Sequence, residues 1–139
     1  MNCPVCRKAM VVLELNQVEI DYCVACGGIW LDAGELELLL GNSGAKDDVL
    51  KSFTPDTGTK ERKIRCPICS KKMIKVICGK ENKVLIDRCP NNDGLWFDEG
   101  ELYQIVKMGG LGENDKVTEM LKDMLGAHLF TDEHRRVRR

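Results

Sequence analysis

Paired cysteines, repeated along the chain, restrict its fold more than any other feature of the sequence. Two Cys-x-x-Cys pairs stand near the start, and a second set with one cysteine fewer stands in the middle of the chain. Two residues between cysteines let a tight turn direct both sulfurs at one ion, and a hairpin between pairs brings the turns together. The pattern therefore predicts two metal-binding modules. The cysteines are Cys3, Cys6, Cys23 and Cys26 in the first and Cys66, Cys69 and Cys89 in the second.

Size and composition also favour two small units. A module of about 40 residues buries too little apolar surface to be stable without a metal or disulfides. Aromatic residues are only 5% of the chain and charged residues 31%, so we do not expect one large apolar core. No targeting segment or membrane span is evident, and we expect a cytoplasmic protein whose thiols stay reduced. The division expected is module one at 1–41, a linker at 42–63, module two at 64–110, and a C-terminal helix with a basic tail at 111–139.

Each module is predicted to be a β-hairpin followed by a short helix, which gives a small, metal-stabilised α+β fold. Runs of strand-forming residues flank Asn16-Gln17 in the first module and 79–83 in the second. Asp32 and Asp98 precede helical runs and are followed three residues later by glutamate, which is the spacing of a capping box. The strands expected are 10–15, 18–23, 73–78 and 84–89, and the helices are 33–40, 102–108 and, as an amphipathic helix, 115–125.

The first cysteine set predicts a closed, structural zinc site. Four cysteines occupy all four coordination positions of a tetrahedral zinc ion, whereas catalytic zinc keeps one position for water. The alternatives are a set of buried or redox-active thiols, an iron centre in a redox protein resembling rubredoxin, and a thiol switch that releases zinc on oxidation.

The second set lacks its fourth cysteine, because Asn92 stands where the first set has Cys26. Asp93, Cys78 and water are the candidates to complete it. Cys78 follows Cys69 by a whole strand, which places it near the hairpin tip and away from the metal. Asp93 lies on the turn itself and carries a carboxylate that zinc accepts. We therefore predict Asp93 as the fourth ligand of a second, weaker zinc site.

The combined strings resemble a known family. The chain looks like tandem copies of the prokaryotic zinc-finger family named for its similarity to the transcription factor IIB zinc ribbon. The matching features are Cys3-Pro-Val-Cys6, the run from Cys23 to Leu36, and the parallel run that ends at Leu102. The resemblance implies zinc binding and a transcription-related or nucleic-acid role, and it often places histidine at the position of Asp93.

Charge differs between the two modules. Residues 1–42 hold two basic and six acidic side chains, whereas residues 65–89 hold seven basic and two acidic ones. The second hairpin is therefore the better candidate for nucleic acid, although we favour a solvated strand face as the explanation of its charges. Its basic residues are Arg65, Lys71, Lys72, Lys75, Lys80, Lys83 and Arg88. The tail Arg135–Arg139 is a further candidate for nucleic acid or an acidic partner.

Together these features predict a non-enzymatic zinc-binding interaction module that contacts protein or nucleic acid in a transcription-related role. Trp30 and Trp96 occupy the same repeat position, and we expect them to pack beside the metal sites rather than stack on bases. The apolar stripe of residues 115–125 is expected to fold back on the chain, to pair with its twin in a homodimer, or to dock on a partner. His128 and His134 are not expected to be ligands.

Overall fold

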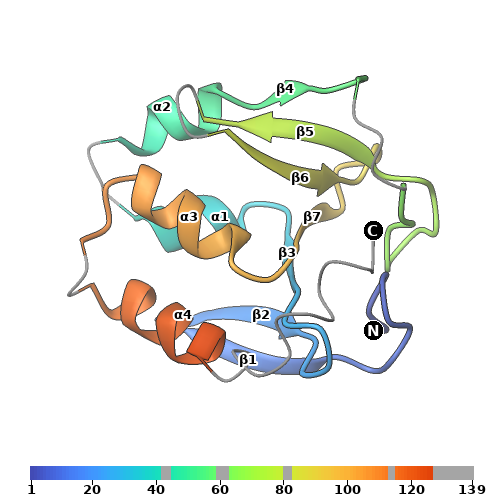
Figure 1. Ribbon diagram of the computed structural model, residues 1–139, viewed down its shortest axis with the longest axis horizontal. Helices are drawn as coiled ribbons and strands as arrows, with labels where there is room; N and C mark the ends of the chain where they lie inside the picture. The colour runs from blue at the N-terminus through green and yellow to red at the C-terminus, as the bar shows by residue number, and fades with distance from the viewer. Residues whose placement is uncertain (42–44, 59–62, 80–82, 113–114, 127–139) are drawn as a thin grey trace.

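Seven antiparallel strands form one sheet that both modules share (Figure 1). The computed structural model describes residues 1–41, 45–58, 63–79, 83–112 and 115–126. The strands are β1 (Val11–Leu15), β2 (Val18–Tyr22), β3 (Ile29–Asp32), β4 (Thr54–Pro55), β5 (Ile74–Cys78), β6 (Val84–Arg88) and β7 (Gly94–Phe97). The helices are α1 (Glu35–Leu40), α2 (Lys46–Lys51), α3 (Glu101–Met108) and α4 (Lys116–Gly126).

The two predicted hairpins are confirmed. Strands β1 and β2 pair from Val11↔Tyr22 to Leu15↔Val18, and β5 and β6 pair in the same way. Asn16 and Gln17 form the tight turn of the first hairpin with φ of 48° and 73°. Two central residues with positive φ match the right-handed twist of the flanking strands, which explains why two residues suffice here.

A third strand in each module joins the two hairpins, and the sequence analysis missed both. β3 pairs with β7 in the antiparallel register Ile29↔Phe97, Trp30↔Trp96, Leu31↔Leu95 and Asp32↔Gly94. Trp30 and Trp96 are equivalent in the repeat, so this register relates the modules by a local two-fold axis at the tryptophan pair. The strand order β1-β2-β3-β7-β6-β5-β4 follows from this central pairing.

The tryptophans pack across the module boundary. Both side chains have no exposed surface, and each donates its indole N–H to an aspartate of its own strand end: Trp30 to Asp32 at 2.8 Å and Trp96 to Asp98 at 3.1 Å. A Cβ placed on Gly28 would lie 2.1 Å from the Trp96 ring, and one on Gly94 would lie 2.6 Å from the Trp30 ring. Each indole therefore covers a glycine beside the metal site of the other module, and neither is available to stack on a base.

Helix α1 begins later than expected and α3 one residue earlier, and both are capped differently than expected. The cap residues are Gly34 and Gly100, both with left-handed φ and no side chain to accept a hydrogen bond. The glutamate half of the expected capping box is present, because Asp32 and Asp98 donate their backbone N–H groups to Glu35 and Glu101 at 2.6 and 2.7 Å. The carboxylates of Asp32 and Asp98 accept from the indole N–H groups of the tryptophans.

One apolar core spans both modules, so the expectation against a single large core was wrong. Buried residues from β1, β2, α1, β5, β6 and α3 form one cluster. Val117 and Leu121 of α4 are buried in the same cluster, while Lys116 and Glu119 are exposed. The β3–β7 pairing explains the difference, because it places the inner faces of two small modules side by side.

The segment between the modules also contributes to the fold. α2 lies within it, and β4 pairs with the outer side of β5 through Thr54↔Ile77 and Pro55↔Val76. Val49 of α2 is buried in the common core. Within the described residues, no helix has both the length and the apolar character needed to cross a membrane.

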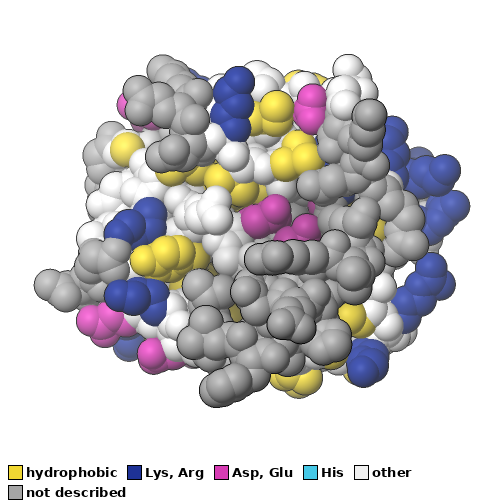
Figure 2. Space-filling model, in the orientation of Figure 1, with side chains coloured by type: hydrophobic (Ala, Val, Ile, Leu, Met, Phe, Trp, Pro, Cys, Tyr) yellow, Lys and Arg dark blue, Asp and Glu magenta, His cyan; other side chains and the backbone are white. Residues whose placement is uncertain are grey.

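The basic residues of the second hairpin do not share one face. Lys75 is 1% exposed and forms an ion pair of 2.6 Å with the equally buried Asp87, so its charge is unavailable to a nucleic acid. Arg65, Lys71 and Lys72 are exposed before the hairpin begins, and Lys83 is exposed near its tip. Figure 2 shows Lys and Arg side chains along one edge of the molecule, on the side where Figure 1 places the N-terminal segment. Lys80, both histidines and the arginine tail lie outside the described residues.

The packing of Trp96 on Gly28 gives a direct test of the module interface. Gly28→Ala should destabilise the zinc-loaded chain by about 1–3 kcal/mol, because the new methyl group overlaps a fixed, buried ring. Gly112→Ala is the matched control, since a Cβ there meets nothing within 4 Å, and it should change stability by less than about 1 kcal/mol. Urea unfolding at a fixed excess of zinc measures both. Equal stability of the two variants would contradict the interface described here.

Candidate metal centres

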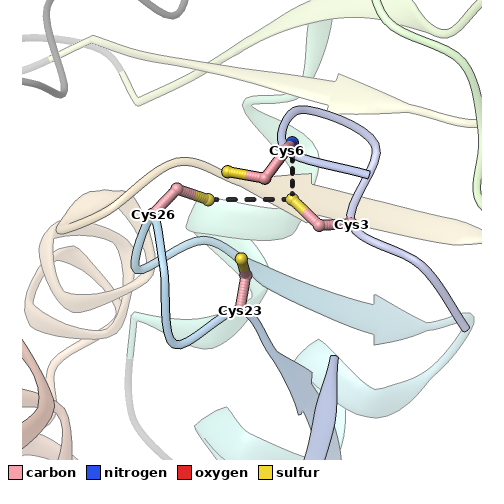
Figure 3. A group of neighbouring side chains, drawn as sticks. All are labelled: Cys3, Cys6, Cys23 and Cys26. Carbon is pink, nitrogen blue, oxygen red and sulfur yellow. Dashed lines mark hydrogen bonds between the residues drawn. The ribbon is translucent and has the colours of Figure 1, made fainter. Parts of the chain in front are cut away.

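Four cysteine sulfurs converge on one point in module one (Figure 3). The turn Cys3–Cys6 precedes β1, and Cys23 and Cys26 lie on the turn between β2 and β3. The four Sγ atoms lie within 4.8 Å of one another, and those of Cys3 and Cys26 are 3.7 Å apart. Three of the four cysteines are buried and Cys6 is half-buried. The structure therefore brings together all four residues predicted for the first site.

Three sulfurs and one carboxylate converge in module two. The donor atoms of Cys66, Cys69, Cys89 and Asp93 also lie within 4.8 Å of one another. The Sγ atoms of Cys69 and Cys89 are 3.5 Å apart, and Asp93 Oδ2 lies 3.4 Å from Cys89 Sγ and 3.6 Å from Cys66 Sγ. Asp93 thus stands where a fourth cysteine would complete the set.

Local backbone conformation explains why Asp93, rather than Asn92, faces the sulfurs. In module one the turn closes with a hydrogen bond from Gly27 N–H to Cys23 O at 2.8 Å, and Gly27 has a φ of 79°. In module two the turn closes one residue earlier, from Asn92 N–H to Cys89 O at 3.1 Å. Asn92 takes the left-handed conformation there with a φ of 60°, which asparagine tolerates better than most residues. The shorter turn shifts the fourth ligand position by one residue, onto Asp93.

Backbone N–H groups point at several of the sulfurs. Cys3 Sγ accepts from Val5 and Cys6 at 3.3 and 3.2 Å. Cys66 Sγ accepts from Ile68 at 3.4 Å, and Cys89 Sγ from Asn91 at 3.3 Å. Such donors stabilise a negative sulfur and so favour the thiolate form that zinc binds.

Cys78 lies far from both centres. Its side chain is completely buried in the common core, where Ser52 Oγ lies 3.7 Å and the Val49 carbonyl 3.9 Å from its sulfur. Burial raises the pKa of the Cys78 thiol, which keeps it neutral. This placement agrees with the expectation that Cys78 packs as a small apolar residue.

Without metal, the donor groups share protons. The hydrogen bond between Cys26 and Cys3 lowers the pKa of Cys3 to about 5 and raises the pKa of Cys26 well above its ordinary value. Burial raises the pKa of Cys6 to about 11 and that of Cys66 to about 12. Hydrogen bonds from Cys69 and Cys89 lower the pKa of Asp93. Metal binding must therefore release protons from the sulfurs but none from Asp93.

Zinc fits both donor sets. A tetrahedral ion with Zn–S bonds of about 2.3 Å separates its sulfurs by roughly 3.8 Å, and the sulfur pairs here are 3.7 and 3.5 Å apart. All eight cysteines of the chain are free of disulfides. Thiolate and carboxylate donors at these distances give two zinc sites, one with four cysteines and one with three cysteines and an aspartate.

The two centres share one buried cluster. In this cluster the five buried ligand cysteines pack with Met10, Met73, Ile64 and both tryptophans, and the partly buried Cys6 and Cys69 pack against it. Ala33 of module one also donates its N–H to the carbonyl of Asp93 at 3.1 Å. Each metal centre is thus in contact with residues of the other module.

Two three-stranded modules, each with a ligand turn on either side of a hairpin, define a tandem zinc-ribbon protein. A family model described as "Transcription factor zinc-finger" matches residues 2–41 and 65–108. The chain belongs to this family, with both of its modules, which confirms the resemblance noted in the sequence. No match was found among curated proteins or among solved structures.

Substitution of Asp93 and Cys78 tests the second donor set. Asp93→Ala should lower zinc affinity at that site by more than about tenfold, since even residues that only support a metal ligand contribute that much. Cys78→Ala should keep both zinc ions and lose only about 1 kcal/mol of stability to a small cavity. Competition with a chromogenic chelator reports the affinities. Zinc loss in Cys78→Ala, with Asp93→Ala unchanged, would reverse the assignment.

Loss of the first site should also weaken the second. Structural zinc supplies on the order of 10 kcal/mol of folding free energy, so Cys23→Ser should abolish amide dispersion over residues 1–40. Because Trp30 covers Gly94, zinc affinity at the second site should fall by about fivefold or more. Chelator competition and amide spectra of residues 64–108 measure the effect, with Cys78→Ala as the control. An unchanged second site would show that the modules are energetically independent.

Proposed function

We propose that this chain is a non-enzymatic binding module, in which two zinc ions hold a rigid platform and the outer surface contacts a macromolecular partner. The observation that carries the proposal is the completeness of the two donor sets. Each set supplies four protein ligands around one point, whereas a catalytic zinc keeps a position for water or substrate. The zinc ions then serve the fold, and recognition falls to the surface.

A transcription-related role is part of the same proposal. Its support is the family, whose printed description is a transcription factor zinc-finger and whose model covers both modules. The buried tryptophans add to it indirectly, because they leave charged and polar side chains, rather than aromatic platforms, to make the contacts. The iron-redox and thiol-switch alternatives stay predictions from the sequence. Metal analysis of protein purified without added metal tests the iron alternative, since an iron centre would colour the protein.

Cobalt substitution tests whether the metal positions are closed. Chain loaded with Co²⁺ at both sites should show the absorption of tetrahedral thiolate coordination, and excess azide should leave that spectrum unchanged because no ligand position is open. Asp93→Ala is the matched control: its second site has lost a ligand, so azide should shift its spectrum. A shift in the unsubstituted chain would reveal an open position and would favour a catalytic role over the one proposed.

A further inference from the structure

We propose that a groove between the modules binds the phosphate backbone of a nucleic acid; this inference rests on the binding function proposed above and names its ligand. The groove has a volume of about 450 Å³. One wall is the turn that carries Cys3 and Cys6, and the other is the turn that carries Cys66 and Cys69. We call these two turns the front turns. The groove exists only when the two modules are packed together, because its walls come from different modules.

Positive charge is concentrated at this groove. Arg7, Lys63 and Arg65 line it, and Lys8, Lys71 and Lys72 lie on the same two segments and are exposed. Residues 1–10 and 63–73 contain no acidic side chain, although the whole chain has a net charge of −1. Six basic residues are thus gathered at one place on a molecule that is otherwise acidic, which is the footprint expected of a site that binds a polyanion.

The groove also has fixed hydrogen-bond donors. The Arg65 guanidinium donates to the Ser70 carbonyl at 3.0 Å, which holds this side chain at the rim. A guanidinium carries five N–H donors in a planar fork that matches a phosphate, so this one bond leaves donors for a ligand. Arg65 therefore joins a held position with the chemistry that recognises phosphate.

The residues that line the groove favour a phosphate ligand over a nucleic-acid base or a protein surface. No aromatic residue lines the groove, and both tryptophans of the chain are fully buried. Stacking on bases needs an exposed aromatic face, and protein interfaces normally have aromatic or methionine anchors. Phosphates need only cations and N–H donors, which are what the groove offers. Binding should consequently depend strongly on salt and weakly on base sequence.

Fluorescence anisotropy with the full, zinc-loaded chain tests this inference. The probe is a labelled single-stranded DNA of mixed sequence, and a duplex and an RNA of the same sequence are compared at low and moderate salt. The double variant Lys63→Glu/Arg65→Glu and the single variant Arg7→Glu should each bind at least about tenfold more weakly, with a smaller salt dependence. Lys83→Glu is the matched control, because it makes the same kind of charge change at an exposed site near the hairpin tip and should bind as the unsubstituted chain does.

Other outcomes overturn the inference. They are the absence of nucleic-acid binding at micromolar concentration, binding that only Lys83→Glu weakens, and displacement by polyglutamate as effective as by DNA, which would favour an acidic protein. If the groove variants lose zinc, their cations balance the charge of the anionic metal centres, and weaker DNA binding by these variants is then not informative. In that case the amide shifts that DNA causes in the unsubstituted chain decide whether the groove binds DNA. DNA should move signals of residues 2–10 and 63–72, and shifts elsewhere alone would refute the groove. If DNA does not bind the groove but azide leaves the cobalt spectrum unchanged, the groove inference is wrong and the proposed non-enzymatic binding function is unaffected.

Discussion

The pairing of β3 with β7 is the interaction on which the rest of the structure depends. Each hairpin alone has one apolar face and too few residues to cover it. The central pair joins the hairpins into one sheet, so that α1, α3 and α4 cover a common apolar surface. It also places Trp30 opposite Trp96, and the indoles then reach over the glycines of the opposite module. A larger side chain at Gly28 or Gly94 is excluded by this close approach, whatever the backbone there would tolerate.

Metal binding and apolar packing are consequently two parts of one arrangement. The ligand cysteines lie in the same buried cluster as both tryptophans, and the cluster is separate from the larger core beneath the helices. Zinc fixes the turns, the turns position the glycines, and the glycines receive the indoles. The exchange of one cysteine for Asp93 introduces a harder donor into this arrangement without changing its outline. The two sites are thus equivalent in position and different in chemistry.

Much of this could be predicted from the sequence, because ligand spacing and strand alternation are local signals. The hairpins, the ligand sets and the burial of Cys78 depend on residues close together in the chain, and they were predicted correctly. The strands around Trp30 and Trp96 were missed because each is only four residues long and pairs with a segment far away in sequence. The single core follows from that pairing and was missed with it. In the sequence Lys75 is indistinguishable from the surface lysines around it. Its burial follows from the strand register, which places it opposite Asp87.

The groove lies between equivalent turns of the two modules, but its charges are asymmetric because the repeats differ in sequence there. The local two-fold axis brings the front turns of both modules together, so equivalent residues face the groove from opposite walls. Lys8 and Lys71 are equivalent in the repeat, and their carbonyls accept equivalent hydrogen bonds of 2.8 Å from the backbone N–H groups of Cys3 and Cys66. The remaining cations are not equivalent, because Arg7 corresponds to Ser70, Arg65 corresponds to Asn2, and Lys63 lies in the segment just before module two. The groove is therefore uneven in charge, although the turns that form its walls occupy equivalent places in the repeat.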